Sequence, residues 1–157
     1  KGELKVQKTV TSDTPTDLSQ KFGFTVTLTN NPLNGAKTYG SGDHAITFDA
    51  DGIAHFSLAH NEYKLATDMP QGIAYTVEET DANGFTTTYS GKTGTISGTQ
   101  AVAVVSNARG EGDLTISKSV DSKVVADQTA TYQFDITLNP AVSGTYSGVT
   151  FTDGVAR

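Results

Sequence analysis

The sequence predicts an all-β protein of the Ig-like sandwich class, and three features predict it. Apolar and polar residues alternate over short runs, as in residues 22–28, which is the pattern of a strand with one buried face. Turn signals such as Asn34-Gly35, Asp51-Gly52 and Asn83-Gly84 separate these runs. No long segment has the period of a helix. Short strands separated by frequent turns are typical of an Ig-like sandwich.

Four runs predict strands in the first two thirds of the chain. Residues 4–10 and 22–28 alternate strictly, and in 75–79 Tyr75 and Val77 alternate with polar neighbours. Residues 102–105 are continuously apolar, which is the pattern of a strand buried on both faces.

An internal repeat at a constant offset organises the chain. Residues 4–10 match 114–120, and 22–28 match 132–138. These matches predict a first domain over residues 1–109 and a second over 113–157, joined by a short glycine-bearing hinge at 108–112. The second domain is an incomplete copy, so the fold class is a tandem repeat. If it is ordered, we expect it to pack against another molecule or to exchange strands with one.

The composition excludes several classes of function. The 157 residues are 36% hydrophobic with a net charge of −6, and scattered Lys and Arg disfavour nucleic-acid binding. No apolar run is long enough to span a bilayer. Without cysteine, a disulfide or thiolate site is excluded. His44, His55 and His60 match no zinc spacing and are interpreted as surface residues. We expect no metal, cofactor or enzymatic turnover, and a secreted hydrolase is poorly supported because no multi-residue active site can be assembled.

Three polar residues fall on the apolar faces of predicted strands. Lys8 shares its parity with three aliphatic residues of 4–10, and Glu79 shares that of Tyr75 and Val77. Asn107 follows the inward positions of the last predicted strand of the first domain. An amine, a carboxylic acid and a carboxamide are therefore expected together in the core. Burial favours their neutral forms, which allows Lys8 to attack the Asn107 carbonyl while Glu79 relays protons.

Other interpretations of these residues stay open. Lys8 alone is also typical of a charged residue that protects an edge strand. Glu78 replaces Glu79 if a bulge reverses the parity, and Asn107 is also suited to capping a strand. The segments 49–52 and 81–84 begin like calcium loops but lack the downstream glutamate in register, so turns are the better interpretation.

The ordered set of motifs resembles the isopeptide-forming pilin and collagen-adhesin B-type (CnaB-like) Ig-like domains of Gram-positive surface proteins. The resemblance covers the first domain and the available part of the second. It rests on these motifs: Leu-x-Val-x-Lys-x-Val at 4–10, Phe-x-Phe-x-Val-x-Leu at 22–28, Phe48 through Asp51-Gly52-Ile53-Ala54 to Phe56, Tyr-Thr-Val-Glu-Glu at 75–79, Gly84-Phe85, and Val104-Val105-Ser106-Asn107. It implies an isopeptide bond between Lys8 and Asn107, assisted by Glu79. Lys118 is the equivalent lysine of the second domain, but that copy lacks the glutamate and asparagine positions.

The resemblance also implies a function. It predicts a structural stalk or backbone module of an extracellular, wall-anchored adhesin or pilus, whose partners are other domains or subunits of the same assembly. The alternative is a ligand-binding adhesin domain that recognises host matrix or glycan through loops at residues 30–42 and 60–71, where Tyr39 and Tyr63 are expected to be exposed.

Overall fold

The computed structural model describes residues 1–29, 33–139 and 141–157 of the chain. These residues divide into two compact units, Lys1–Glu111 (unit 1) and Gly112–Arg157 (unit 2). The elements of unit 1 are β1 (Gly2–Thr11), α1 (Pro15–Ser19), β2 (Phe22–Thr29), β3 (Lys37–Tyr39), the 3-10 turn η1 (Gly42–His44), β4 (Ile46–Phe48), β5 (Ile53–Leu58), β6 (Tyr63–Met69), β7 (Ala74–Glu79), β8 (Thr86–Ser90), β9 (Thr93–Thr95) and β10 (Gln100–Ala108).

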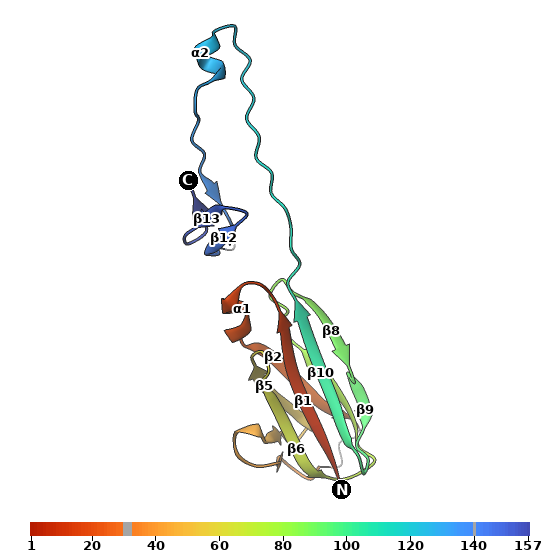
Figure 1. Ribbon diagram of the computed structural model, residues 1–157. Helices are drawn as coiled ribbons and strands as arrows, with labels where there is room; N and C mark the ends of the chain where they lie inside the picture. The colour runs from red at the N-terminus through yellow and green to blue at the C-terminus, as the bar shows by residue number, and fades with distance from the viewer. Residues whose placement is uncertain (30–32, 140) are drawn as a thin grey trace. The chain divides into compact units, whose positions relative to one another are not determined.

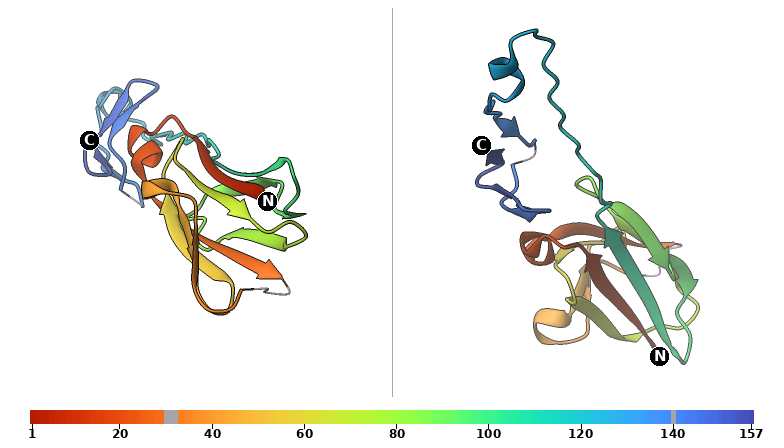
Figure 2. Two further views of the ribbon diagram at one scale, coloured as in Figure 1. Left: turned by 90° about the horizontal axis from the view of Figure 1, so that it is seen from below. Right: turned by 45° about the horizontal axis from the view of Figure 1, so that its top comes forward.

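Unit 1 is built from two four-stranded sheets, in the orders β6-β1-β10-β8 and β5-β2-β7-β9, with β3 and β4 forming a separate two-stranded ribbon. Figures 1 and 2 show the two sheets as the layers of a sandwich. The predicted all-β, Ig-like sandwich is therefore confirmed. The first and last strands, β1 and β10, are parallel neighbours, whereas the other strand pairs of both sheets are antiparallel.

The inward faces of these strands form the core of unit 1. Every second residue of β1 and β2 is buried, as the alternating sequence pattern requires. Fully or nearly fully buried core residues include Leu4, Val6, Val10, Phe22, Phe24, Val26, Leu28, Tyr75, Val77, Ala103 and Val105. The β10 strand differs from the prediction that 102–105 is buried on both faces, because Val102 is 42% exposed. Only one side of its sheet is covered by the other sheet.

Both segments predicted as ligand-binding loops, 60–71 and 30–42, contain strand residues. Residues 60–71 contain the whole of strand β6, which pairs with β1 in the first sheet. Tyr39, expected to be exposed, is only 7% exposed, and its ring meets that of Phe48 edge-on. In the other predicted loop, 30–42, residues 30–32 lie outside the described residues.

Unit 2 contains the short helix α2 (Val125–Gln128) and four short strands, β11 (Ile136–Thr137), β12 (Gly144–Tyr146), β13 (Val149–Phe151) and β14 (Val155–Ala156). The strands pair as β11-β14 and β12-β13. The strand predicted at 114–120 does not form, and that at 132–138 is reduced to β11. In unit 1 the matching strand β1 pairs with β6 and β10. The described residues of unit 2 contain no counterpart of either strand, so residues 114–120 have no partner strand with which to form a ladder. No helix among the described residues is long and apolar enough to cross a bilayer.

Candidate functional site

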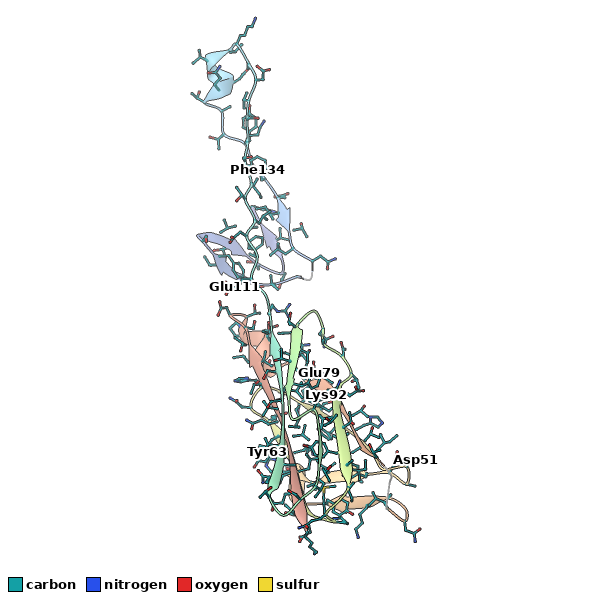
Figure 3. The ribbon with its side chains drawn as sticks, turned by 90° about the vertical axis from the view of Figure 1, so that its right-hand side faces the viewer. Asp51, Tyr63, Glu79, Lys92, Glu111 and Phe134 are labelled. Carbon is teal, nitrogen blue, oxygen red and sulfur yellow. The ribbon has the colours of Figure 1, made fainter. Side chains whose placement is uncertain are left out.

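Three strands bring one polar side chain each to the end of the sandwich from which β10 leaves unit 1. Lys8 lies near the end of β1 and Asn107 near the end of β10. In the parallel ladder Lys8 pairs with Val105, and Asn107 pairs with Val10. Lys8 and Asn107 are therefore diagonal neighbours on one inward face. Glu79 ends β7 in the opposite sheet, and Figure 3 shows it toward this end of unit 1.

The carboxyl group of Glu79 bridges the other two side chains. Lys8 Nζ donates to Glu79 Oε2 over 2.6 Å, and Asn107 Nδ2 donates to Glu79 Oε1 over 2.7 Å. The side chains of Lys8 and Glu79 are 0% and 1% exposed, and Asn107 is 1% exposed. Water is thus excluded from an amine, a carboxyl group and a carboxamide that share one hydrogen-bonded cluster.

Burial controls the chemistry of the Lys8 amine. Desolvation lowers the pKa of Lys8 below its ordinary value, and the hydrogen bond and charge of Glu79 offset only part of that effect. The Nζ atom also lies 4.3 Å from the centre of the Phe22 ring. The surroundings therefore make a neutral, nucleophilic amine more accessible at Lys8 than at an exposed lysine.

The carboxamide of Asn107 is only half satisfied. Its Nδ2 atom donates to Glu79, but its Oδ1 atom is buried and has no hydrogen-bond partner among the described residues. A buried carbonyl oxygen without a donor is unfavourable. A half-turn of the amide group would exchange the two atoms and direct Oδ1 toward Glu79, where a protonated carboxyl group can donate to it.

Two further residues hold Glu79 in place, and sequence reasoning missed both. Thr87 Oγ1 donates to Glu79 Oε1 over 3.2 Å, and the backbone N–H of Glu79 donates to the Tyr89 hydroxyl over 3.1 Å. Both residues lie on β8, at the edge of the sheet that contains Lys8. Alternation places Thr87 and Tyr89 on one face of their strand. Their contact with Glu79 depends on long-range pairing that the local pattern does not encode.

The structure also decides between the alternatives left open by the sequence. β1 lies between β6 and β10, so Lys8 is not on an edge strand. Glu78 points outward, with its side chain 60% exposed and paired with Lys92 at 3.1 Å. Lys118 is exposed in unit 2, where its Nζ atom donates to the carbonyl oxygen of Ser119.

The segments that begin like calcium loops are turns. Asp49 Oδ1 accepts the backbone N–H groups of Asp51 and Ile53, each over 2.9 Å. In the second segment Asp81 Oδ1 accepts the backbone N–H of Asn83. These are the local contacts by which aspartate stabilises a turn.

One of the histidines differs from its interpretation as a surface residue. His60 is half-buried, and its Nδ1 atom accepts the backbone N–H of Val10 over 2.8 Å. His44 and His55 are exposed. The His60 ring thus completes the hydrogen bonding of β1 at a position just beyond the β6 ladder.

The sandwich, with its parallel first and last strands, makes unit 1 an Ig-like β-sandwich domain. Residues 2–109 match the family described as a domain of unknown function, DUF7601, and the chain belongs to this family. A search of curated proteins found no significant match.

Several solved structures similar to this chain are pilus proteins. The pilus-presented adhesin Spy0125 (Cpa) is 26% identical with a TM-score of 0.57, over 68% of this chain and 27% of the adhesin. The major pilin T3.2 from Streptococcus pyogenes is 25% identical with a TM-score of 0.55, over 69% of this chain and 45% of the pilin. The chain therefore spans less than half the length of either protein. Another S. pyogenes major pilin, T-13, at 21% identity and a TM-score of 0.56, shares the fold.

Proposed function

We propose that this chain is part of a structural stalk or backbone of a bacterial cell-surface adhesin or pilus, and that unit 1 is stabilised by a self-formed isopeptide bond between Lys8 and Asn107. The observation that supports this proposal most directly is the buried Glu79 carboxyl group, which accepts hydrogen bonds from both Lys8 and Asn107. The reaction happens once in each molecule, so it is self-processing without turnover.

The proposed reaction is an amide exchange. The neutral Lys8 Nζ attacks Cγ of Asn107, and a protonated Glu79 donates to the carbonyl oxygen as negative charge develops there. Glu79 then passes a proton from the attacking nitrogen to the departing Nδ2. The Nζ–Cγ bond forms, the Cγ–Nδ2 bond breaks, and one ammonia leaves. No oxidant, metal or cofactor is needed to balance the step.

Folding supplies the rate enhancement. An amine and an amide react very slowly in water, but groups held in contact reach effective concentrations on the order of 10⁵ M or more. Lys8 and Asn107 come from strands that are far apart in sequence and adjacent in the β1–β10 ladder. The reaction therefore requires the folded sandwich, and the bond forms only in chains that have folded.

The bond would give unit 1 a mechanical role. β1 and β10 run parallel, so the start of β1 and the end of β10 lie at opposite ends of the sandwich (Figure 1). A force applied to these ends would pass along β1 to Lys8, through the covalent bond to Asn107, and out of unit 1. The residues between Lys8 and Asn107 would be shielded from the load. This behaviour suits a stalk.

The location and partners follow from the same proposal. The adhesin and the pilin that resemble this chain are pilus proteins. We therefore place this chain outside the cell, on the surface of a Gram-positive bacterium and attached to its wall, where it contacts other domains or subunits of one assembly.

Intact-mass spectrometry of the folded protein tests the proposal. Wild type is expected to weigh one ammonia less than its sequence, and Lys8→Ala, Glu79→Ala and Asn107→Ala are expected to have their full sequence masses. Lys118→Ala is the matched lysine control and should lose ammonia like wild type. A folded wild type with its full sequence mass would rule out the bond.

A ligand-binding adhesin domain remains the second candidate, because one similar structure is a pilus-presented adhesin. A surface depression of about 350 Å³ beside His44 and Tyr63 is the place to test it. Two of its lysines already have partners: Lys21 pairs with Glu62, and Lys64 Nζ donates to the backbone carbonyl oxygen of Asp43. A glycan or matrix-protein array should show specific binding that Tyr63→Ala abolishes if this function is real.

A further inference from the structure

A second polar contact ties the two strands of the proposed crosslink together just beyond the reacting groups. Asp17, on α1 after β1, accepts hydrogen bonds from Arg109 Nε at 2.6 Å and Nη2 at 3.0 Å. The side chain of Asp17 is 7% exposed and that of Arg109 is 33% exposed. A forked contact of this kind fixes orientation as well as distance. Arg109 follows directly after β10, two residues beyond Asn107.

The Arg109 backbone extends the same ladder. Its N–H donates to the Thr11 carbonyl oxygen over 3.0 Å, at the end of β1. The backbone and the side chain of Arg109 therefore both hold the end of β10 against the segment formed by β1 and α1. Asn107 lies on β10 between Arg109 and the core residues of that strand.

A row of aromatic contacts links Arg109 to the reacting amine. The guanidinium carbon of Arg109 lies 4.2 Å from the centre of the Phe85 ring. Phe85 meets Phe22 edge-on, with ring centres 5.3 Å apart, and the Phe22 ring lies 4.3 Å from Lys8 Nζ. Arg109 thus covers the Phe85 ring and helps to exclude water from the Lys8 side of the cluster.

We propose that the Asp17–Arg109 pair positions the groups of the crosslink. It fixes the end of β10 so that the Asn107 carboxamide stays in reach of Lys8. It also covers the Phe85 ring, which packs against Phe22 beside Lys8. This inference rests on the proposed isopeptide bond. Asp17 and Arg109 do not touch the reacting atoms, so their effect is on the rate of the reaction and not on its chemistry.

The repeat shows that the α1 corner itself does not need the arginine. In unit 1, Ser12 Oγ donates to Asp17 Oδ2 and accepts the backbone N–H of Thr14. In unit 2, Ser122 Oγ makes the matching contacts, to Asp127 over 2.7 Å and from Val124 over 3.1 Å.

Among the described residues of unit 2, this corner forms while Arg157 pairs with Asp135 and not with Asp127. Arg157, the only arginine of unit 2, contacts Asp135. Serine and aspartate are therefore sufficient for the turn. The contribution of Arg109 lies in what it does to β10.

The kinetics of ammonia loss test this proposal. Chain that has never folded, made by chemical synthesis and dissolved in urea, is diluted into native buffer, and samples quenched in acid are weighed by mass spectrometry. Arg109→Lys keeps the charge but loses the forked, planar contact, and Asp17→Asn removes the anion. Both variants are expected to fold and then to lose ammonia at least ~10-fold more slowly than wild type, because small misplacements of reacting groups strongly reduce rates.

Two controls separate positioning from stability. Lys21→Gln removes the exposed Lys21–Glu62 pair and should react at the wild-type rate. Leu28→Val weakens the core at the far end of β2 and serves as a destabilised but correctly positioned reference. It should react faster than Asp17→Asn under conditions where both are folded.

The outcomes are distinct. Folded Arg109→Lys and Asp17→Asn proteins that react as fast as wild type would overturn the positioning role and leave the bond itself intact. If neither variant folds, the pair is a requirement of the fold and the proposal is also overturned. A wild type that never loses ammonia would instead remove the isopeptide bond, and the positioning role with it.

Discussion

Lys8 and Asn107 lie diagonally on adjacent parallel strands, and both donate hydrogen bonds to the carboxyl group of Glu79. An ion pair alone would explain Lys8 and Glu79. It does not explain a buried carboxamide whose Oδ1 atom has no hydrogen-bond partner in the part of the chain that the structure describes. In the proposed product the nitrogen of Lys8 becomes an amide nitrogen, so the cost of burying a charged amine disappears.

The response to force is the first prediction. Wild type pulled between its N-terminus and a handle at Gly110 should show no unfolding step from unit 1, because the bond holds the loop closed. Glu79→Ala, which cannot relay protons, should release a loop of about 100 residues and lengthen by up to ~350 Å. Single-molecule force spectroscopy measures both values.

Asn107→Ala provides the control for this experiment, since it keeps the Lys8–Glu79 contact and loses only the electrophile. It should extend like Glu79→Ala. A wild type that extends by the same length would contradict the covalent load path.

The equilibrium stability of unit 1 should also depend on the bond. By analogy with a disulfide, closing a loop of about 100 residues removes unfolded-state entropy equivalent to about 4–5 kcal/mol. Wild type should therefore exceed Asn107→Ala by an amount of that order in the free energy of unfolding, measured with guanidinium chloride. Equal unfolding midpoints for the two proteins would argue against a crosslink.

The sequence predicted the face on which each cluster residue lies but not all of its contacts. Strand parity alone directs Lys8, Glu79 and Asn107 inward, because side-chain alternation is a local property. The parallel pairing of β1 with β10 is a property of the whole fold. This parallel pairing places Asn107 beside β1 and Lys8, and no local sequence pattern reveals the pairing.

The contacts that sequence reasoning missed have the same origin. Arg109 lies in the predicted hinge, and Asp17 lies in a short helix that has no periodic signal. Their pairing joins two segments that are distant in sequence. The strand predicted at 114–120 does not form for the opposite reason: its alternating pattern is present, but the described part of unit 2 contains no strand that would pair with it.

The rate of crosslinking should depend on pH through Lys8. Attack requires the neutral amine, and desolvation lowers the Lys8 pKa from its ordinary value of 10.5, with Glu79 partly opposing the shift. Where proton loss from Lys8 limits the rate, ammonia loss by freshly folded protein should therefore accelerate at lower pH than an ordinary lysine would allow. Quenched-flow mass spectrometry over a pH series measures this profile. A rate that rises only as pH approaches 10.5 would show that Lys8 is not desolvated when it reacts.

The Asp17–Arg109 contact should make the stability of unit 1 sensitive to acid. Burial alone would raise the pKa of Asp17, but hydrogen bonds from Arg109 and Ser12 and the Arg109 charge outweigh it. They hold the pKa below the ordinary value of 3.8. A carboxyl group with a lowered folded-state pKa stabilises the protein above its unfolded-state pKa, and this stabilisation is lost as pH falls through the folded-state pKa.

Urea unfolding of Asp17→Asn in the unreacted Asn107→Ala background tests that effect without interference from the crosslink. Near neutral pH the Asp17→Asn substitution should reduce the free energy of unfolding by roughly 1–3 kcal/mol, since it removes a charged, mostly buried hydrogen-bond partner of a partly exposed arginine. This difference should persist down to about pH 4 and then shrink in stronger acid, where Asp17 itself becomes neutral. If the difference stayed constant at every pH, the stabilisation would come from the shape of the side chain and not from its charge.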